Sequence, residues 1–174
     1  MNDEWQQQFR DVWDRGVAAW KAGRRSPATM FAPDDAAFLA TIGCSAQELF
    51  DFVDDGQCYG DVDCSTALAV TAIRREYFLK VMSGKPTGRV VPMRDLPAKS
   101  AAVDGIAWLP RLIVKARLKL RGELDPDIMY GCGGDRPFLA GMNLTLPQFL
   151  QLVWDNGDND RAIVEAVKKS GGLA

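Results

Sequence analysis

Residues 35–40 read Asp-Ala-Ala-Phe-Leu-Ala, and residues 135–140, one hundred positions later, read Asp-Arg-Pro-Phe-Leu-Ala. The correspondence extends outward at the same spacing, so that Val53 recurs as Val153. Internal similarity at a fixed spacing indicates an architecture built from related units. We therefore predict an all-α protein of two related helical lobes packed around a shared core. We expect the paired apolar residues to be buried at equivalent positions, Phe38 with Phe138 and Val53 with Val153.

The same spacing repeats a signal for the start of a helix. Ser45 precedes Glu48 by three residues, and Thr145 precedes Gln148 by three residues. This spacing is typical of a capping box, in which the hydroxyl and the longer side chain each bond a backbone N–H group of the other residue. We predict a helix after each box. The glycines expected to end these helices are Gly56 and Gly157.

Three further helices are expected from periodicity and capping residues. Asp34 is predicted to cap a short helix that runs through Thr41. Longer helices are predicted over residues 3–22, where apolar residues follow helical spacing, and over residues 65–82. The second of these is expected to present Val70, Ile73, Tyr77 and Val81.

Glycine and proline interrupt the helical pattern after residue 83. Such residues mark turns and connections. We therefore predict an N-terminal lobe over residues 1–83, a linker over residues 84–92 and a C-terminal lobe over residues 93–174.

Composition narrows the class of protein. The chain has 174 residues with 47% hydrophobic and 25% charged residues, which is ordinary for a globular protein. Its four cysteines form no Cys-x-x-Cys pair, which favours free thiols and a reducing compartment. The N-terminus has no secretory pattern, and no apolar run reaches membrane length. These features predict a soluble, cytoplasmic protein without a membrane partner.

Charge is unevenly distributed along the chain. Residues 26–73 contain eight acids and no Lys or Arg, whereas residues 74–121 contain twelve bases and three acids. Each run can simply be a solvated face. Alternatively, the two runs attract each other, within one chain or between two copies in a homo-oligomer. Nucleic-acid binding is disfavoured, because the acidic run would repel phosphates.

A basic helix is expected over residues 108–121. Val114 and Leu118 lie almost opposite its main apolar stripe. Two stripes on one helix predict contact on both sides. The main stripe consists of Leu109, Leu112, Ile113, Ala116 and Leu120.

Three motifs give the chain a family resemblance. They are the helix Leu109-Pro-Arg-Leu-Ile-Val-Lys-Ala-Arg117, the loop Tyr130-Gly-Cys-Gly-Gly-Asp135, and a closing helical pair from Phe149 to Val167. Over roughly residues 93–170 the chain resembles an uncharacterised bacterial domain-of-unknown-function family. That family has no assigned activity, so the resemblance implies fold and compartment. The first lobe resembles a diverged copy of the closing helices that lacks a basic helix of its own.

Two positions depart from the family pattern. The family commonly has an acid at the position of Val114, and a Pro-Leu pair at Gly133-Gly134. Either departure can convert a polar site into a packing position.

The glycine loop is the main candidate for chemistry. The chain contains no histidine, so Ser-His and Cys-His relays are excluded. Glycines allow backbone N–H groups to approach a ligand, and a helix start beside them favours an anion or the thiolate of a cysteine. We predict Cys132 and Asp135 as catalytic residues. The predicted ligand-binding residues are Arg111, Lys115, Tyr130, Gly133, Gly134 and Arg136.

A structural interpretation of the same loop stays open. Asp135 can simply cap a helix, and Cys132 can be a small buried apolar residue. A zinc site at Cys58 and Cys64 is disfavoured, because their spacing fits no known zinc motif. No nucleotide-binding fingerprint is present, so neither a metal nor a cofactor is expected.

Two functional hypotheses follow, and neither establishes whether the protein is an enzyme. In the first, the Cys132 loop and the basic helix bind a small anionic molecule, with or without thiol chemistry at Cys132. In the second, the protein is a helical interaction module, and the exposed stripe of Val114 and Leu118 docks on an acidic protein surface or on another copy of the chain.

Overall fold

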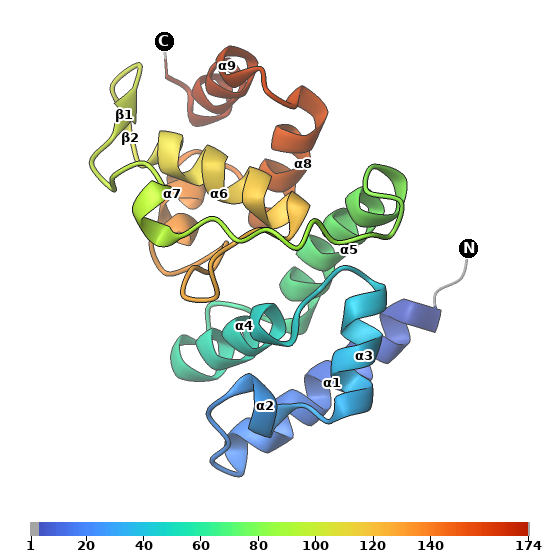
Figure 1. The fold of residues 1–174 in the computed structure, drawn as a ribbon. Coiled ribbons are helices and arrows are strands. Elements are labelled where there is room, and N and C mark those ends of the chain that lie inside the picture. The colour runs from blue at the N-terminus through green and yellow to red at the C-terminus, as the bar shows by residue number, and fades with distance from the viewer. Residues whose placement is uncertain (1–3, 174) are drawn as a thin grey trace. The chain divides into compact units, whose positions relative to one another are not determined.

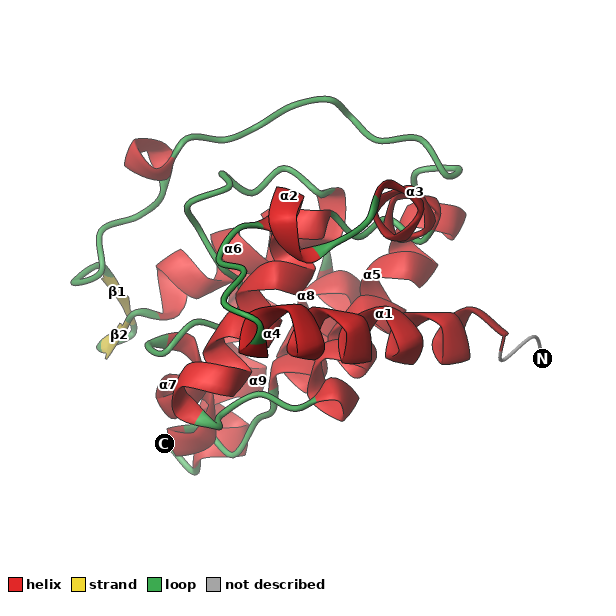
Figure 2. Cartoon of the chain, turned by 90° about the horizontal axis from the view of Figure 1, so that it is seen from below, coloured by secondary structure: helices red, strands yellow, loops and turns green. Residues whose placement is uncertain are grey.

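A computed structural model describes residues 4–173, which are mainly helical (Figures 1 and 2). The predicted all-α class is confirmed. The only strands in these residues, β1 (Ala102–Val103) and β2 (Ile106–Ala107), form one small antiparallel hairpin. The helices are α1 (Glu4–Lys21), α2 (Pro27–Met30), α3 (Pro33–Thr41), α4 (Ala46–Tyr59), α5 (Cys64–Lys80), η1 (Met93–Asp95), α6 (Leu109–Arg121), α7 (Asp135–Gly141), α8 (Leu146–Asn156) and α9 (Asp160–Gly171).

The chain divides into two compact units. The first ends at Pro86 and the second begins at Thr87. Each unit has a long helix that packs against the helix after a capping box: α1 against α4, and α6 against α8. The division into lobes at residues 83 and 93, with a linker between them, stays a prediction.

The first unit is built on the apolar face of α1. Phe9, Val12 and Trp13 are buried at helical spacing, and Gly16 allows the ring of Phe31 to come close. This confirms the helix predicted over residues 3–22, except that Asp3 lies outside the described residues. The indole of Trp20 donates a hydrogen bond to Asp54 across the same packing, at 2.7 Å.

Both predicted capping boxes are present. The Ser45 hydroxyl accepts from the Glu48 amide at 3.1 Å, and the Ser45 amide donates to the Glu48 carboxylate at 2.8 Å. The corresponding distances between Thr145 and Gln148 are 3.4 and 2.8 Å. These side chains satisfy backbone N–H groups that the first turn of a helix leaves without partners.

One of the two predicted helix ends is wrong. Gly56 does not end α4, which continues to Tyr59 and closes on Gly60 in the left-handed region. Gly56 is required for packing instead, because a Cβ there would collide with the carbonyl oxygen of Val62. Gly157 does follow α8, as predicted.

Asp34 is not the cap of α3. The N-cap is Ala32, whose amide donates to the carboxylate of Asp35 at 3.3 Å. Pro33 occupies the first turn, where its missing N–H group costs nothing. The acid two residues inside the helix therefore has the role that was predicted for Asp34.

The buried face of α5 differs from the face expected over residues 65–82. Asp63 caps the helix by accepting from the Thr66 amide at 2.8 Å. Val81 is 53% exposed. Two polar residues, Thr71 and Arg74, are buried in its place, together with apolar residues of the same face.

The second apolar stripe of α6 is covered by residues of its own unit. Leu118 is buried against Leu96 and Ile128, and Val114 is partly buried beside them. A single parallel bridge between Val91 and Leu124 ties the two covering segments together. The contact predicted on both sides of this helix is therefore confirmed, and the exposure of Val114 and Leu118 that the interaction hypothesis requires is absent.

The closing helices of the second unit carry most of its remaining core. Phe149 and Val153 on α8 are buried, as is Val53 in the first unit. Phe38 is buried, whereas Phe138 is only partly buried. The expected equivalence therefore holds for the valines and fails in part for the phenylalanines.

No single helix in residues 4–173 is long and apolar enough to cross a membrane. The pair α3 and α4 reaches the required length and composition together, but the two helices meet at an angle of 105°.

Candidate functional site

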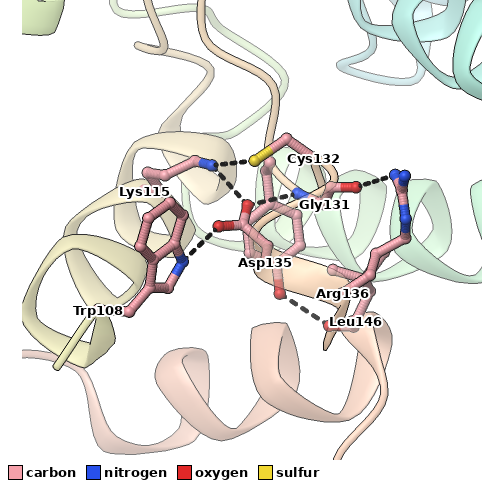
Figure 3. Close-up of polar contacts among 8 residues, drawn as sticks. Trp108, Lys115, Gly131, Cys132, Asp135, Arg136 and Leu146 are labelled. Atoms are coloured by element: carbon pink, nitrogen blue, oxygen red, sulfur yellow. Dashed lines mark hydrogen bonds and ion pairs between the residues drawn. The ribbon is translucent and has the colours of Figure 1, made fainter. Parts of the chain in front are cut away.

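Asp135 is the centre of a polar cluster in the second unit (Figure 3). It begins α7, and it is 0% exposed. Its Oδ2 lies 2.5 Å from Nζ of Lys115 and accepts from the Gly131 amide at 2.9 Å. Its Oδ1 accepts from the indole of Trp108 at 2.9 Å. Three donors from three segments thus satisfy one buried carboxylate, as a buried charge requires.

Local backbone geometry brings Trp108 to this place. Trp108 precedes α6 with φ at +73°, a conformation that a bulky residue rarely adopts. Its ring packs directly on Gly134, where a Cβ would lie 2.5 Å from ring carbon Cζ2. Gly134 therefore makes room for the indole.

Cys132 shares the Lys115 ammonium with Asp135. Its Sγ lies 3.4 Å from Nζ, and the side chain of Lys115 is only 3% exposed. Cys132 itself is a free, partly buried thiol. The sulfur of Cys132 thus lies against a buried cation.

Tyr130 and Arg136 support the loop from two sides. The hydroxyl of Tyr130 donates to the carbonyl of Leu146 at 2.8 Å. Burial, and to a lesser degree the charge of Asp135, raise the pKa of Tyr130 well above its ordinary value. The guanidinium of Arg136 donates to the carbonyl of Gly131 at 2.6 Å. Both side chains therefore fix the path of the chain around Cys132.

Two predicted ligand residues have different surroundings. Arg111 donates to the carbonyl of Pro97 at 2.7 Å, and no contact joins it to the Asp135 cluster. Gly133 is exposed beside Cys132. Of the predicted site residues, the structure thus brings Lys115, Cys132 and Asp135 into mutual contact.

The position predicted for an external anion is filled by the protein itself. Asp135 places a carboxylate at the start of α7 and takes up the donors of Lys115 and Gly131. It does so from inside the helix, because the residue before α7 is Gly134, which has no side chain to cap with.

Among residues 4–173, no group of three or more Cys, Asp or Glu residues is placed to hold a metal ion. The free thiols of Cys58 and Cys64 belong to the part of the chain covered by that statement.

Trp108 was not among the site residues predicted from the sequence. Its role depends on its unusual backbone conformation and on a glycine 26 residues away. The pairing of Lys115 with Asp135, in contrast, can be recognised in the sequence from the repeat. Arg15 and Asp35 have the same separation, one hundred residues earlier, and they also form an ion pair.

The comparison with known families covers the region that contains this cluster. Residues 95–173 match the family model described as Domain of unknown function (DUF5069). The resemblance predicted for roughly residues 93–170 is confirmed. No curated protein and no solved structure matches the chain. All residues of the Asp135 cluster lie in the DUF5069 segment, and the whole first unit lies outside it.

Proposed function

We propose that the DUF5069 segment binds a small anionic molecule at the solvent side of the glycine loop, and that Cys132 lies there as a reactive thiol. The observation that carries this proposal is the 3.4 Å contact between Sγ and the Lys115 ammonium. A thiolate is the nucleophilic form of cysteine, and an adjacent cation stabilises it. Because Lys115 is buried, water screens its charge only weakly.

Asp135 supports this role as a positioning residue. The long side chain of a lysine loses conformational freedom when it is fixed. Its ion pair with Asp135, at 2.5 Å, holds the ammonium at the place where it meets the sulfur. Lys115 and Asp135 together are neutral. The preference for a small anionic ligand therefore rests on Arg136, which is anchored beside the loop.

Alkylation with iodoacetamide tests the proposal directly. We expect Cys132 to react faster than Cys58, although Cys58 is the more exposed thiol. Cys64 should react slowly, because burial raises the pKa of its thiol. Mass spectrometry of tryptic peptides at pH 7 gives the four rates. If Cys132 reacts more slowly than Cys58, or only after unfolding, the proposed function is wrong.

The alternative function is an interaction module that docks through Val114 and Leu118. This stripe is not available to a partner, because other residues of the second unit cover it. Docking on an acidic surface or on a second copy would need another face of the basic helix. A cytoplasmic location belongs to the proposal as well. The four free cysteines support a reducing compartment.

We also infer that the chain is a helical repeat. The ion pairs of Arg15 with Asp35 and of Lys115 with Asp135 support a register of one hundred residues. The two capping boxes support the same register. An experimental structure tests this inference: α1, α3 and α4 should superpose on α6, α7 and α8 in that register, and superposition in another register would contradict it.

A further inference from the structure

A buried guanidinium lies in the first unit, far in sequence from the proposed thiol site. Arg74 on α5 is only 2% exposed, and Thr71, one turn earlier on the same face, is 1% exposed. Residues three apart on a helix are neighbours. The hydroxyl of Thr71 and the guanidinium of Arg74 therefore form one polar patch in an otherwise apolar face, which is completed by Ala67 and Phe78.

The donors of this patch have no acceptor. Within the described residues, Nε and Nη1 of Arg74 and Oγ1 of Thr71 are buried and make no hydrogen bond. The nearest recorded contact of the guanidinium is the ring of Phe78, with 5.1 Å between its carbon and the ring centroid. Nearly all buried polar groups in proteins are hydrogen-bonded, so a group without a partner calls for an explanation such as a bound ion or ligand.

Other buried charges of the chain are paired. Lys115 is bonded to Asp135, and Glu123 to Arg121. Asp35 is bonded to Arg15. Among the described residues, the buried nitrogen atoms without a hydrogen-bond partner belong to Arg74 and to its neighbour Arg75, whose guanidinium also reaches Glu76 at 3.6 Å.

The helical arrangement does not require an arginine at this position. Counted from the N-cap residues of α5 and α9, Thr71 corresponds to Val167 and Arg74 corresponds to Ser170. Val167 is buried and apolar, and the Ser170 hydroxyl donates to the carbonyl of Asn143 at 3.4 Å. At the corresponding positions of α9, the second unit therefore has no unsatisfied donor among the residues that the structure describes.

The surroundings of Arg74 act on its pKa in two directions. Burial lowers the pKa of Arg74, and Glu48, Cys44 and Tyr77 oppose that shift. One carboxylate oxygen of Glu48 accepts from the amide of Ser45 in the capping box, at 2.8 Å. The carboxylate that raises the pKa of Arg74 thus also serves as a helix cap.

We propose that Arg74 and Thr71 bind a small oxyanion, either phosphate or the carboxylate group of a small molecule. Three donors lie on one helix face, and two of them belong to the cationic guanidinium of Arg74. A ligand that satisfies them must offer several acceptor atoms and negative charge. Oxyanions match both requirements, and arginine binds them more strongly than it binds neutral acceptors. A water molecule would satisfy donors but leave the charge unpaired.

Isothermal titration calorimetry of the full chain tests this proposal. Inorganic phosphate and acetate are titrated separately, with ionic strength held constant by sodium chloride. We expect saturable one-to-one binding of at least one of them. Tighter binding of phosphate indicates a phosphate source, and tighter binding of acetate indicates a carboxylate source. No saturable heat with either anion overturns the proposal.

Variants assign the binding to this patch. Thr71→Val keeps the size of the side chain and removes the hydroxyl, so we expect affinity to fall by about tenfold, a typical effect of one lost hydrogen bond. Lys80→Met is the matched control, because it removes one exposed positive charge from the same helix. Arg74→Met should abolish binding, and if it fails to fold, Thr71→Val decides. Equal affinities of the wild type and Thr71→Val would overturn the proposal.

Discussion

Asp35 in the first unit and Asp135 in the second are carboxylates in the first turn of a short helix, with similar partners and different surroundings. Each accepts from a backbone amide of the preceding loop, that of Ala32 or Gly131. Each is paired with a cation twenty residues earlier on the long helix of its unit. The difference lies in exposure. The side chain of Arg15 is 54% exposed, and that of Lys115 is 3% exposed.

This difference distinguishes the contacts that both units share from the contacts that the second unit has in addition. A carboxylate that joins the long helix to the following loop is common to both units. Only the second unit adds the indole of Trp108 and the thiol of Cys132 to its carboxylate pair. The residues at the corresponding places of the first unit are Gln8 and Ala32. We therefore interpret the ion pair as structural and the buried thiol contact as functional.

The largest expected effect is a difference in the free energy of unfolding lost when each carboxylate is removed. Asp135→Ala leaves the Lys115 ammonium buried without its partner, and we expect a loss of about 3–5 kcal/mol in the free energy of unfolding. Asp35→Ala frees a largely exposed Arg15 that water can solvate, and we expect a loss of about 1 kcal/mol. Urea denaturation followed by circular dichroism measures both. Equal losses would show that the difference in burial has no energetic consequence.

The indole of Trp108 provides the next test. Gly134→Ala places a Cβ against the Trp108 ring, and we expect a loss of about 2 kcal/mol from overpacking. Gly133→Ala is the matched control, because the nearest atom to its Cβ would be Nη2 of Arg136, at 3.8 Å. The control should change stability by less than about 0.5 kcal/mol. If the two variants are equally stable, Trp108 does not pack as described.

Tyr130 gives a smaller effect that depends on pH. Its pKa is raised by burial in the folded protein, so its neutral form is favoured there. The stability it contributes is fully present below the pKa of an unfolded tyrosine, about 10, and falls as pH rises above that value. Tyr130→Phe should cost about 1 kcal/mol at pH 8 through the lost bond to Leu146. It should also weaken the alkaline decline.

Urea denaturation between pH 8 and 11 checks this prediction. Tyr59→Phe is the control, because Tyr59 is 71% exposed. A wild-type protein whose stability does not fall above pH 10, or falls equally in Tyr130→Phe, would show that Tyr130 is not the group responsible.

The capping boxes give the smallest effect and compare the units directly. Ser45→Ala should cost about 1 kcal/mol, a typical loss for an N-cap. Thr145→Ala should cost less, because its hydroxyl accepts at 3.4 Å, against 3.1 Å for Ser45. Melting temperatures of the two variants rank them. The reverse order would show that these distances do not reflect cap strength.

Much of the fold was predictable from local signals. The capping boxes at Ser45 and Thr145 depend on residues three apart, so the sequence alone predicts them correctly. Asp34 failed as a cap because Pro33 moves the helix start back to Ala32, which changes which acid reaches the first amide. Gly56 failed as a helix end because its role is a close approach to Val62, which is not a local property.

The candidate site was predictable only in part. The glycine loop identified Cys132 and Asp135, and the basic helix supplied Lys115. The direction of each cation was not predictable, because Lys115 faces the cluster whereas Arg111 bonds to Pro97. The cover over Leu118 comes from two loop segments without periodicity, and such segments carry no signal of where they pack.

The central claim is that the Lys115 ammonium makes Cys132 reactive. The double variant Lys115→Met/Asp135→Asn removes both charges at once, so no unpaired buried charge is left behind. Its alkylation rate by iodoacetamide at pH 7 is compared with that of the wild type, with the exposed Cys58 as an internal reference in each sample. We predict that the rate of Cys132 falls by about tenfold, the usual size of one lost charged hydrogen bond, while the rate of Cys58 stays the same. An unchanged rate at Cys132 in a folded double variant would contradict the account.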